Sequence, residues 1–117
     1  MSQSVRIRNA TRETMLAEHG EVADNPWRRL KGLIGRRGFE PGEGLVLQDC
    51  RGIHTWFMGF PIDVLHVDRT CVVRRVMAKL PPNRIGPLVW RSSFVVELPA
   101  GVVQASGTRV GDRLSLD

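Results

Sequence analysis

The chain has 117 residues, of which 42% are hydrophobic and 25% charged, a balance typical of a soluble globular protein of one domain. The formal net charge of +5 comes almost entirely from arginine, since Lys31 and Lys79 are the only lysines. No segment approaches the roughly 20 apolar residues that span a membrane, and the N-terminus lacks the apolar core of a signal peptide, so we expect a cytoplasmic protein.

The first third of the chain predicts two short strands and one helix. Val5 and Ile7 alternate with polar residues, which indicates a half-buried strand over Ser4–Ala10. A turn over 11–14 leads to a second short strand over Met15–Glu18, with pairing extended by Val22 and Ala23. Asp24-Asn25-Pro26 is a helix-start signal, and the helical spacing that follows predicts a helix over Pro26–Ile34 with the apolar stripe Trp27, Leu30, Leu33 and Ile34.

The rest of the chain alternates short apolar runs with turn residues. A loop is expected at Phe39–Gly44, a second loop at Pro81–Pro87, and one helical turn at Val102–Ser106. The predicted strands are Leu45–Leu47, Ile53–Met58, Ile62–Asp68, Cys71–Leu80, Ser92–Leu98 and Leu114–Leu116. The sequence therefore predicts a mainly β single domain, α+β at the margin: a compact barrel-like or folded-over sheet of about seven or eight short strands with one short helix.

Several segments, in the same order, resemble those of a widespread prokaryotic family of uncharacterised proteins, domain of unknown function 192. They are Arg29–Arg36, Gly44-Leu45, Trp56-Phe57-Met58, Pro61-Ile62-Asp63, Val96–Gly101 and Gly111-Asp112. The resemblance implies a compact, mostly β, barrel-like fold and brings no established activity. Gly59 and His66 depart from the residues common in that family, so a role that rests on either position is not carried over.

The central segment Gly44–Asp68 gathers most of the chemically reactive side chains. If Gly59-Phe60-Pro61 is a three-residue hairpin connection, antiparallel pairing places Met58 opposite Ile62, Trp56 opposite Val64 and His54 opposite His66. A connection one residue longer moves Asp63 to the face of His54. The candidate pocket comprises His54, Trp56, Met58, Asp63, Glu97 and Arg91.

Asp63 and Glu97 are carboxylates within apolar strands, where a charge must be paired or hydrogen-bonded or become protonated. Asp63 is interpreted either as a pocket acid or base, or as a structural cap that accepts backbone N–H bonds after Pro61. The cap is the favoured interpretation. Arg91 or Arg74 is a plausible partner for either carboxylate.

Metal and enzyme chemistry find little support in the sequence. His54 and His66 could share a metal, but only Asp68 or Cys50 could add a ligand, so no metal and no cofactor are predicted. No nucleophile elbow, phosphate-binding glycine loop or zinc-protease motif is present, and no catalytic residue is assigned. The same hairpin pairing brings Cys50 near Cys71, and both are expected to be free thiols.

Five basic residues without an acid form a candidate anion-binding surface: Arg28, Arg29, Lys31, Arg36 and Arg37. We predict a non-catalytic module, a monomer or weak dimer away from membranes, that binds a small ligand or a protein near the hairpin and the Pro81–Pro87 loop. Trp90 is expected to be partly exposed beside that loop. The alternatives are anion or nucleic-acid binding through the basic surface, and a hydrolase centred on Asp63 and His54.

Overall fold

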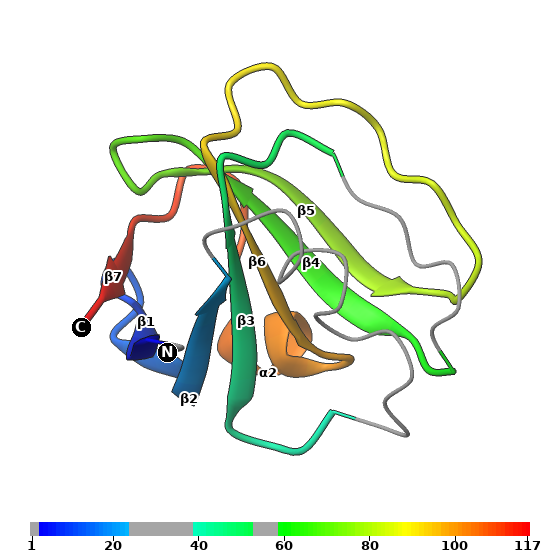
Figure 1. The fold of residues 1–117 in the computed structure, drawn as a ribbon. Helices are drawn as coiled ribbons and strands as arrows, with labels where there is room; N and C mark the ends of the chain where they lie inside the picture. Colours follow the sequence, from blue (N-terminus) through cyan, green and yellow to red (C-terminus); the bar gives the residue numbers. More distant parts are fainter. Residues whose placement is uncertain (1–2, 24–38, 53–58) are drawn as a thin grey trace.

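The protein folds around one seven-stranded sheet (Figure 1). The computed structural model describes residues 3–23, 39–52 and 59–117. Its elements are β1 (Gln3–Asn9), β2 (Thr14–Ala23), β3 (Glu43–Gln48), β4 (Ile62–Val67), β5 (Val73–Leu80), β6 (Phe94–Pro99), α2 (Val102–Ser106) and β7 (Leu114–Leu116).

The strand order is β5-β4-β6-β3-β2-β1-β7. Among these seven described strands, only β2 and β3 pair in parallel, and the other neighbours are antiparallel. The sheet curls until its two ends meet, because Val72 beside β5 bridges Arg113 beside β7. Backbone hydrogen bonds from Val73 N to Asp112 O and from Leu114 N to Cys71 O, both 2.8 Å, reinforce this seam between the two ends. The sheet is thus a folded-over half-barrel, which confirms the predicted fold class.

Apolar side chains form one cluster on each face of the curled sheet. All seven strands contribute to the larger cluster, which also holds Val103 of α2. The smaller cluster comes from the opposite side chains of β2, β3, β4 and β6, with Phe39 and Phe60 packed against it. Since side chains alternate along a strand, a strand covered on both faces is buried at every position. This is so for β4, where all six residues are buried.

Two glycines permit close approach of neighbouring strands. A Cβ atom on Gly44 of β3 would lie 2.8 Å from Ala17 Cβ, and one on Gly20 would lie 2.8 Å from Ile7 Cδ1. Both distances are shorter than van der Waals contact, so larger residues would force β1, β2 and β3 apart. Gly20 lies inside β2, which is one continuous strand of ten residues and not the short strand with an extension that was expected.

The predicted central hairpin is wrong. One edge of β4 pairs with β5 and the other pairs with β6, so neither edge is open to the segment before it. His66 lies opposite Arg75 and Val95, and Val64 lies opposite Met77 and Glu97. The reason is competition between pairing partners: β5, which follows β4 through a tight turn, occupies one edge, and β6, which comes later in the chain, occupies the other. The predicted helix Pro26–Ile34 and strand Ile53–Met58 fall on residues outside those described.

The other predicted elements are confirmed within a few residues. The loop expected at Pro81–Pro87 lies between β5 and β6, and the helical turn Val102–Ser106 is α2. Gly101 and Gly107 flank this helix with φ of 103° and 71°, left-handed values that glycine adopts without strain.

Candidate functional site

Strand β4 directs two polar side chains to opposite faces of the sheet. Asp63 shares a face with Leu65 and Val67, whereas His66 shares the other face with Ile62 and Val64. Both polar side chains are fully buried, with 0% of their surface exposed. A buried polar group needs a partner or carries a desolvation cost, so the partners of each side chain define what it can do.

Among the described residues, Asp63 is bonded by backbone donors alone. Its Oδ1 accepts a hydrogen bond from Lys79 N at 2.7 Å, and its Oδ2 accepts from Gly101 N at 3.0 Å and Val103 N at 2.8 Å. The carboxylate thus joins the end of β5 to the first turn of α2. This geometry matches the capping interpretation, with backbone amides in place of the arginine partner that was considered.

The arginines considered as partners for Asp63 lie elsewhere. Arg74 bonds the carboxylate of Asp68 through Nε at 2.7 Å. Asp68 also accepts from Thr70 N and Val72 N, which shapes the tight turn between β4 and β5. Burial opposes ionisation of Asp68, but these hydrogen bonds and that of the Thr70 hydroxyl outweigh it and lower the pKa of the carboxyl group. Arg91 is exposed beside Trp90.

His66 has one ring nitrogen in a hydrogen-bond chain and one without a described partner. Its Nδ1 lies 3.2 Å from Ser92 Oγ, and this hydroxyl donates to Cys50 O at 2.7 Å. Because the hydroxyl proton is used by Cys50, Nδ1 is assigned as the donor and Nε2 as the acceptor. Within residues 3–23, 39–52 and 59–117, no group bonds buried Nε2. Burial, and secondarily the charge of Arg75, lowers the pKa of His66.

Glu97 lies on the same face of the sheet as His66, one strand away. Val64 is opposite Glu97 and His66 is opposite Val95, so the two polar groups are diagonal neighbours on β6 and β4. Glu97 is 6% exposed, and Leu45 is its neighbour on β3. Burial raises the pKa of Glu97 to about 7, and no described residue bonds its carboxyl group. We call these two side chains the Glu97–His66 pair: a buried carboxyl group with a raised pKa, and diagonally across the two strands an imidazole with a lowered pKa.

Of the predicted pocket, the structure places Asp63 and Glu97 on opposite faces of the sheet and Arg91 at the surface. His54, Trp56 and Met58 lie outside the described residues, as do Arg28, Arg29, Lys31, Arg36 and Arg37. In the part of the chain that the structure describes, no three His, Cys, Asp or Glu side chains gather as metal ligands. Cys50 and Cys71 form no disulfide bond.

An exposed apolar surface on the loop between β5 and β6 was only partly predicted. Trp90 is 73% exposed, Ile85 70% and Leu88 56%. The loop is held at its base, because Val89 N donates to Arg51 O at 2.8 Å and Ser92 N donates to Val89 O at 3.0 Å. The guanidinium of Arg51 lies 6.0 Å from the Trp90 ring centroid, within range of a cation–π contact. We call Ile85, Leu88 and Trp90 the apolar loop surface.

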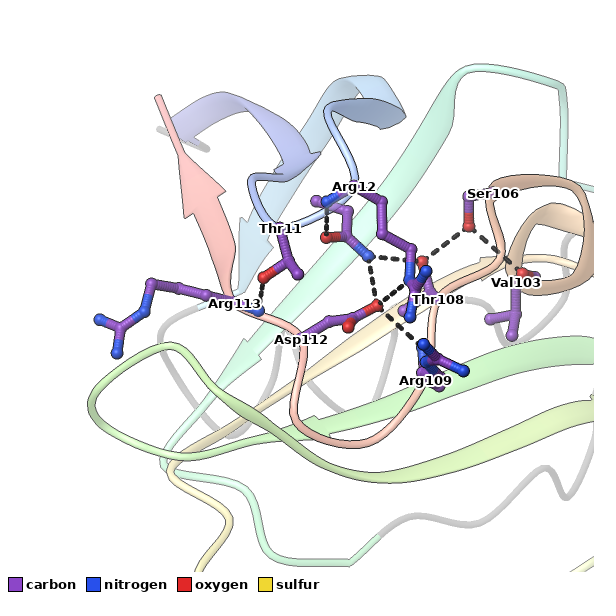
Figure 2. A network of polar contacts seen from close by, with 9 residues as sticks. Thr11, Arg12, Val103, Ser106, Thr108, Arg109, Asp112 and Arg113 are labelled. Carbon is purple, nitrogen blue, oxygen red and sulfur yellow. Dashed lines mark hydrogen bonds and ion pairs between the residues drawn. The ribbon is translucent and has the colours of Figure 1, made fainter.

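Sequence reasoning also missed a buried polar network that closes the seam (Figure 2). Asp112 Oδ2 accepts hydrogen bonds from Asn9 Nδ2 at 2.9 Å, Arg12 Nε at 2.7 Å and Arg109 N at 3.1 Å. Asn9 also donates to Thr108 Oγ1 at 3.0 Å. Desolvation of Asp112 is outweighed by these bonds, so its pKa is lowered. The sequence pointed to this network only through the turn residues Gly111-Asp112. The side chains that bond Asp112, those of Asn9 and Arg12, lie about 100 positions earlier in the chain.

No helix among the described residues is both long and apolar enough to cross a membrane. Comparison with known proteins finds a family model, DUF192, described as "Uncharacterized ACR", that matches residues 7–116. No curated protein matches the sequence.

Two solved structures are similar to the chain over nearly its whole length. One is a protein of unknown function from Novosphingobium aromaticivorans DSM 12444, with 19% identity, a TM-score of 0.82, and coverage of 97% of this chain and 84% of that chain. The other, from Sinorhizobium meliloti 1021, is described provisionally as a transcription regulator; identity is 25%, the TM-score is 0.79, and coverage is 99% of this chain and 94% of that chain.

Proposed function

Because the chain belongs to the uncharacterised family DUF192, which assigns no activity, we propose from its own surface that it is a non-catalytic module binding a protein partner. The contact is made by the apolar loop surface between β5 and β6. The observation that carries this proposal is the exposure of three large apolar side chains on the loop between β5 and β6: Ile85, Leu88 and Trp90.

Exposed apolar side chains are common singly, but a group of them that includes tryptophan is typical of a contact surface. The loop also presents them in a defined shape, since its base is bonded to Arg51 and to the Ser92–Cys50 contact. Preorganisation of this kind lowers the entropy lost on binding.

Charge indicates the chemistry of the partner. Arg51 lies against Trp90, and exposed Arg91 follows it directly. Arginine beside tryptophan is the combination found at binding hot spots. The protein as a whole is basic, with a formal net charge of +5. We therefore propose a partner segment that combines an apolar anchor with flanking Asp or Glu residues.

Two observations support a non-catalytic role over a hydrolase. Asp63, the carboxylate proposed for hydrolysis, has three backbone donors and 0% exposure. The Glu97–His66 pair has suitable chemistry for acid–base work, but both groups are buried among apolar residues. Asp63 is fully buried and Glu97 is 6% exposed, so neither carboxylate is presented openly to a substrate.

The partner proposal can be tested with a displayed library of random peptides selected on the immobilised protein. We expect enriched peptides to combine apolar and acidic residues, and we expect Trp90→Ala and Leu88→Ala to weaken their binding roughly tenfold or more. The matched control is Met15→Ala, which removes an apolar side chain that is 41% exposed on β2. Absence of enrichment, or equal loss in the control, contradicts the proposal.

Nucleic-acid binding is the second candidate. It is supported by the net charge and by the description of the Sinorhizobium meliloti protein as a transcription regulator. Its test is fluorescence anisotropy with duplex DNA and with RNA at several salt concentrations. A protein that contacts many phosphates loses affinity steeply as salt rises, whereas a peptide held by an apolar anchor with a few flanking acidic residues loses less.

We also propose a cell location and an assembly state for the protein. A cytoplasmic location agrees with free thiols at Cys50 and Cys71. We propose a monomer or weak dimer, which sedimentation equilibrium measures directly. If a dimer forms and Trp90→Ala dissociates it, the occupant of the apolar loop surface is a second copy of the chain.

A further inference from the structure

A second surface feature lies away from the apolar loop surface, beside the seam. It is an open depression of about 640 Å³ between β5 and the segment that precedes β7. Its lining comprises Arg74, Arg75 and Val76 from β5, with Thr108, Arg109 and Val110 from the other side. We call it the arginine depression. Its two walls belong to segments more than 30 residues apart, which the curling of the sheet brings together.

The two walls are held in fixed relative positions. Val73 N donates to Asp112 O and Gly111 N donates to Val73 O, each at 2.8 Å. The backbone N–H of Arg109 itself donates to Asp112 Oδ2 (Figure 2). Because Asp112 is 4% exposed and bonded by several donors, it anchors the Arg109 wall to the body of the protein. The arginine depression is therefore a preorganised surface, unlike arginines on a free loop.

The charges in the depression are mostly uncompensated. Arg74 is paired with Asp68 through Nε at 2.7 Å. Arg75 and Arg109 have no carboxylate partner among the described residues, and both are exposed. The nearby acids, Asp68 and Asp112, are buried and already bonded, so they do not neutralise these two guanidinium groups.

Guanidinium groups bind phosphate through paired N–H donors. The remaining lining is apolar on both sides: Val76 is half-buried, and Val110 is 58% exposed. Thr108 contributes shape alone, because its hydroxyl already contacts Asn9 and Ser106. The lining thus places the guanidinium groups of Arg75 and Arg109 beside the apolar side chains of Val76 and Val110.

We propose that the arginine depression binds an organic phosphate, with the phosphate between Arg75 and Arg109 and its organic part against Val110. A small ligand is favoured over a nucleic acid because the two arginines share one local depression that also carries a valine on each side. This site is separate from the proposed protein contact.

The test is a titration of ¹⁵N-labelled protein with inorganic phosphate, pyrophosphate and adenosine 5′-monophosphate, followed by NMR. We expect saturable shifts in the amides of residues 74–76 and 108–110, with the nucleotide binding more tightly than phosphate alone. Arg75→Ala and Arg109→Ala should each weaken binding roughly tenfold, and Arg75→Lys should restore it only in part, since lysine lacks the planar fork.

Arg6→Ala is the matched control, because Arg6 is an exposed arginine on β1 outside the depression. Equal weakening in Arg6→Ala would overturn the proposal in favour of general charge attraction. Absence of saturable binding below about 10 mM would also overturn it, as would duplex DNA binding that displaces the nucleotide with a steep salt dependence. All variants change exposed side chains, so unchanged melting curves verify that each is folded.

Discussion

Asp63 and Glu97 show how two carboxylates in similar sequence settings acquire different roles. Each lies between apolar residues in a buried strand. Asp63 meets three backbone N–H donors, whereas no described residue bonds Glu97. The carboxylate of Asp63 holds the end of β5 against the first turn of α2, whereas burial raises the pKa of Glu97. The difference comes from partners that are distant in the chain.

Asp63→Asn should destabilise the protein by about 2–4 kcal/mol, because the amide loses the charge and places N–H hydrogens toward backbone donors. Urea unfolding followed by circular dichroism measures this change. Glu18→Gln, at an exposed position on β2, is the control and should change stability little. Unchanged stability of Asp63→Asn would show that the three backbone contacts contribute little.

Glu97 should make stability depend on pH. Its folded-state pKa of about 7 exceeds its ordinary value of 4.5, so folding favours the protonated form. Its stabilising contribution is complete below about pH 4.5 and is lost as the pH rises through 7, by a total of about 3 kcal/mol. Glu97→Gln should therefore match the wild type at pH 4 and exceed its unfolding free energy at pH 8.

The comparison of Glu97→Gln with wild type isolates this carboxyl group from His66. The lowered pKa of His66 acts in the opposite direction, since it favours folding as the pH rises through the unfolded-state value. Urea titrations at pH 4 and pH 8 measure the unfolding free energy of the wild type and of Glu97→Gln. A stability difference that does not grow with pH would contradict the burial of an unpaired carboxyl group.

At the scale of elements, polar contacts hold the seam between the two ends of the sheet. They join the end of β1 and the turn after it to the segment before β7. Three residues are central: Asn9 at the end of β1, Arg12 in the following turn, and Asp112 before β7. Asn9 is 0% exposed and Asp112 is 4% exposed, so loss of one partner leaves the others desolvated without compensation. The network thereby fixes the turn after β1 against the segment that precedes β7.

Asp112→Ala should cost about 3 kcal/mol, and Arg12→Ala should cost less because Arg12 is partly exposed. The double variant should show a coupling energy of about 1 kcal/mol in a double-mutant cycle from urea unfolding. Additive effects of the two substitutions would show that their 2.7 Å contact does not contribute to stability.

For the whole molecule, the curled sheet divides the strands into a doubly covered centre and thinly covered ends. Strands β4 and β6 are paired on both edges and have apolar clusters on both faces. Strand β7 has three residues and ends the sheet order. Such differences in burial set the free energy of local opening.

Native-state hydrogen exchange should therefore be slowest for the amides of β4 and β6 and faster for the amide of Leu116 on β7 by roughly tenfold or more. An NMR exchange series in D₂O measures this order. Equal protection of β7 and β4 would indicate that the seam opens only with the whole sheet.

The sequence by itself determined most of the strand positions among the described residues, the mainly β class and the family, because alternation, turn residues and motif order are local signals. It also pointed to Asp63 as a capping carboxylate and to exposure of Trp90. Only the tertiary structure decided the partners of β4, the backbone donors to Asp63, the burial of Glu97, and the presence of Arg75 and Arg109 in the lining of one depression. The physical reason is that strands pair with segments that can lie far away in the chain, and a one-residue change in register moves every side chain of a strand to the other face of the sheet.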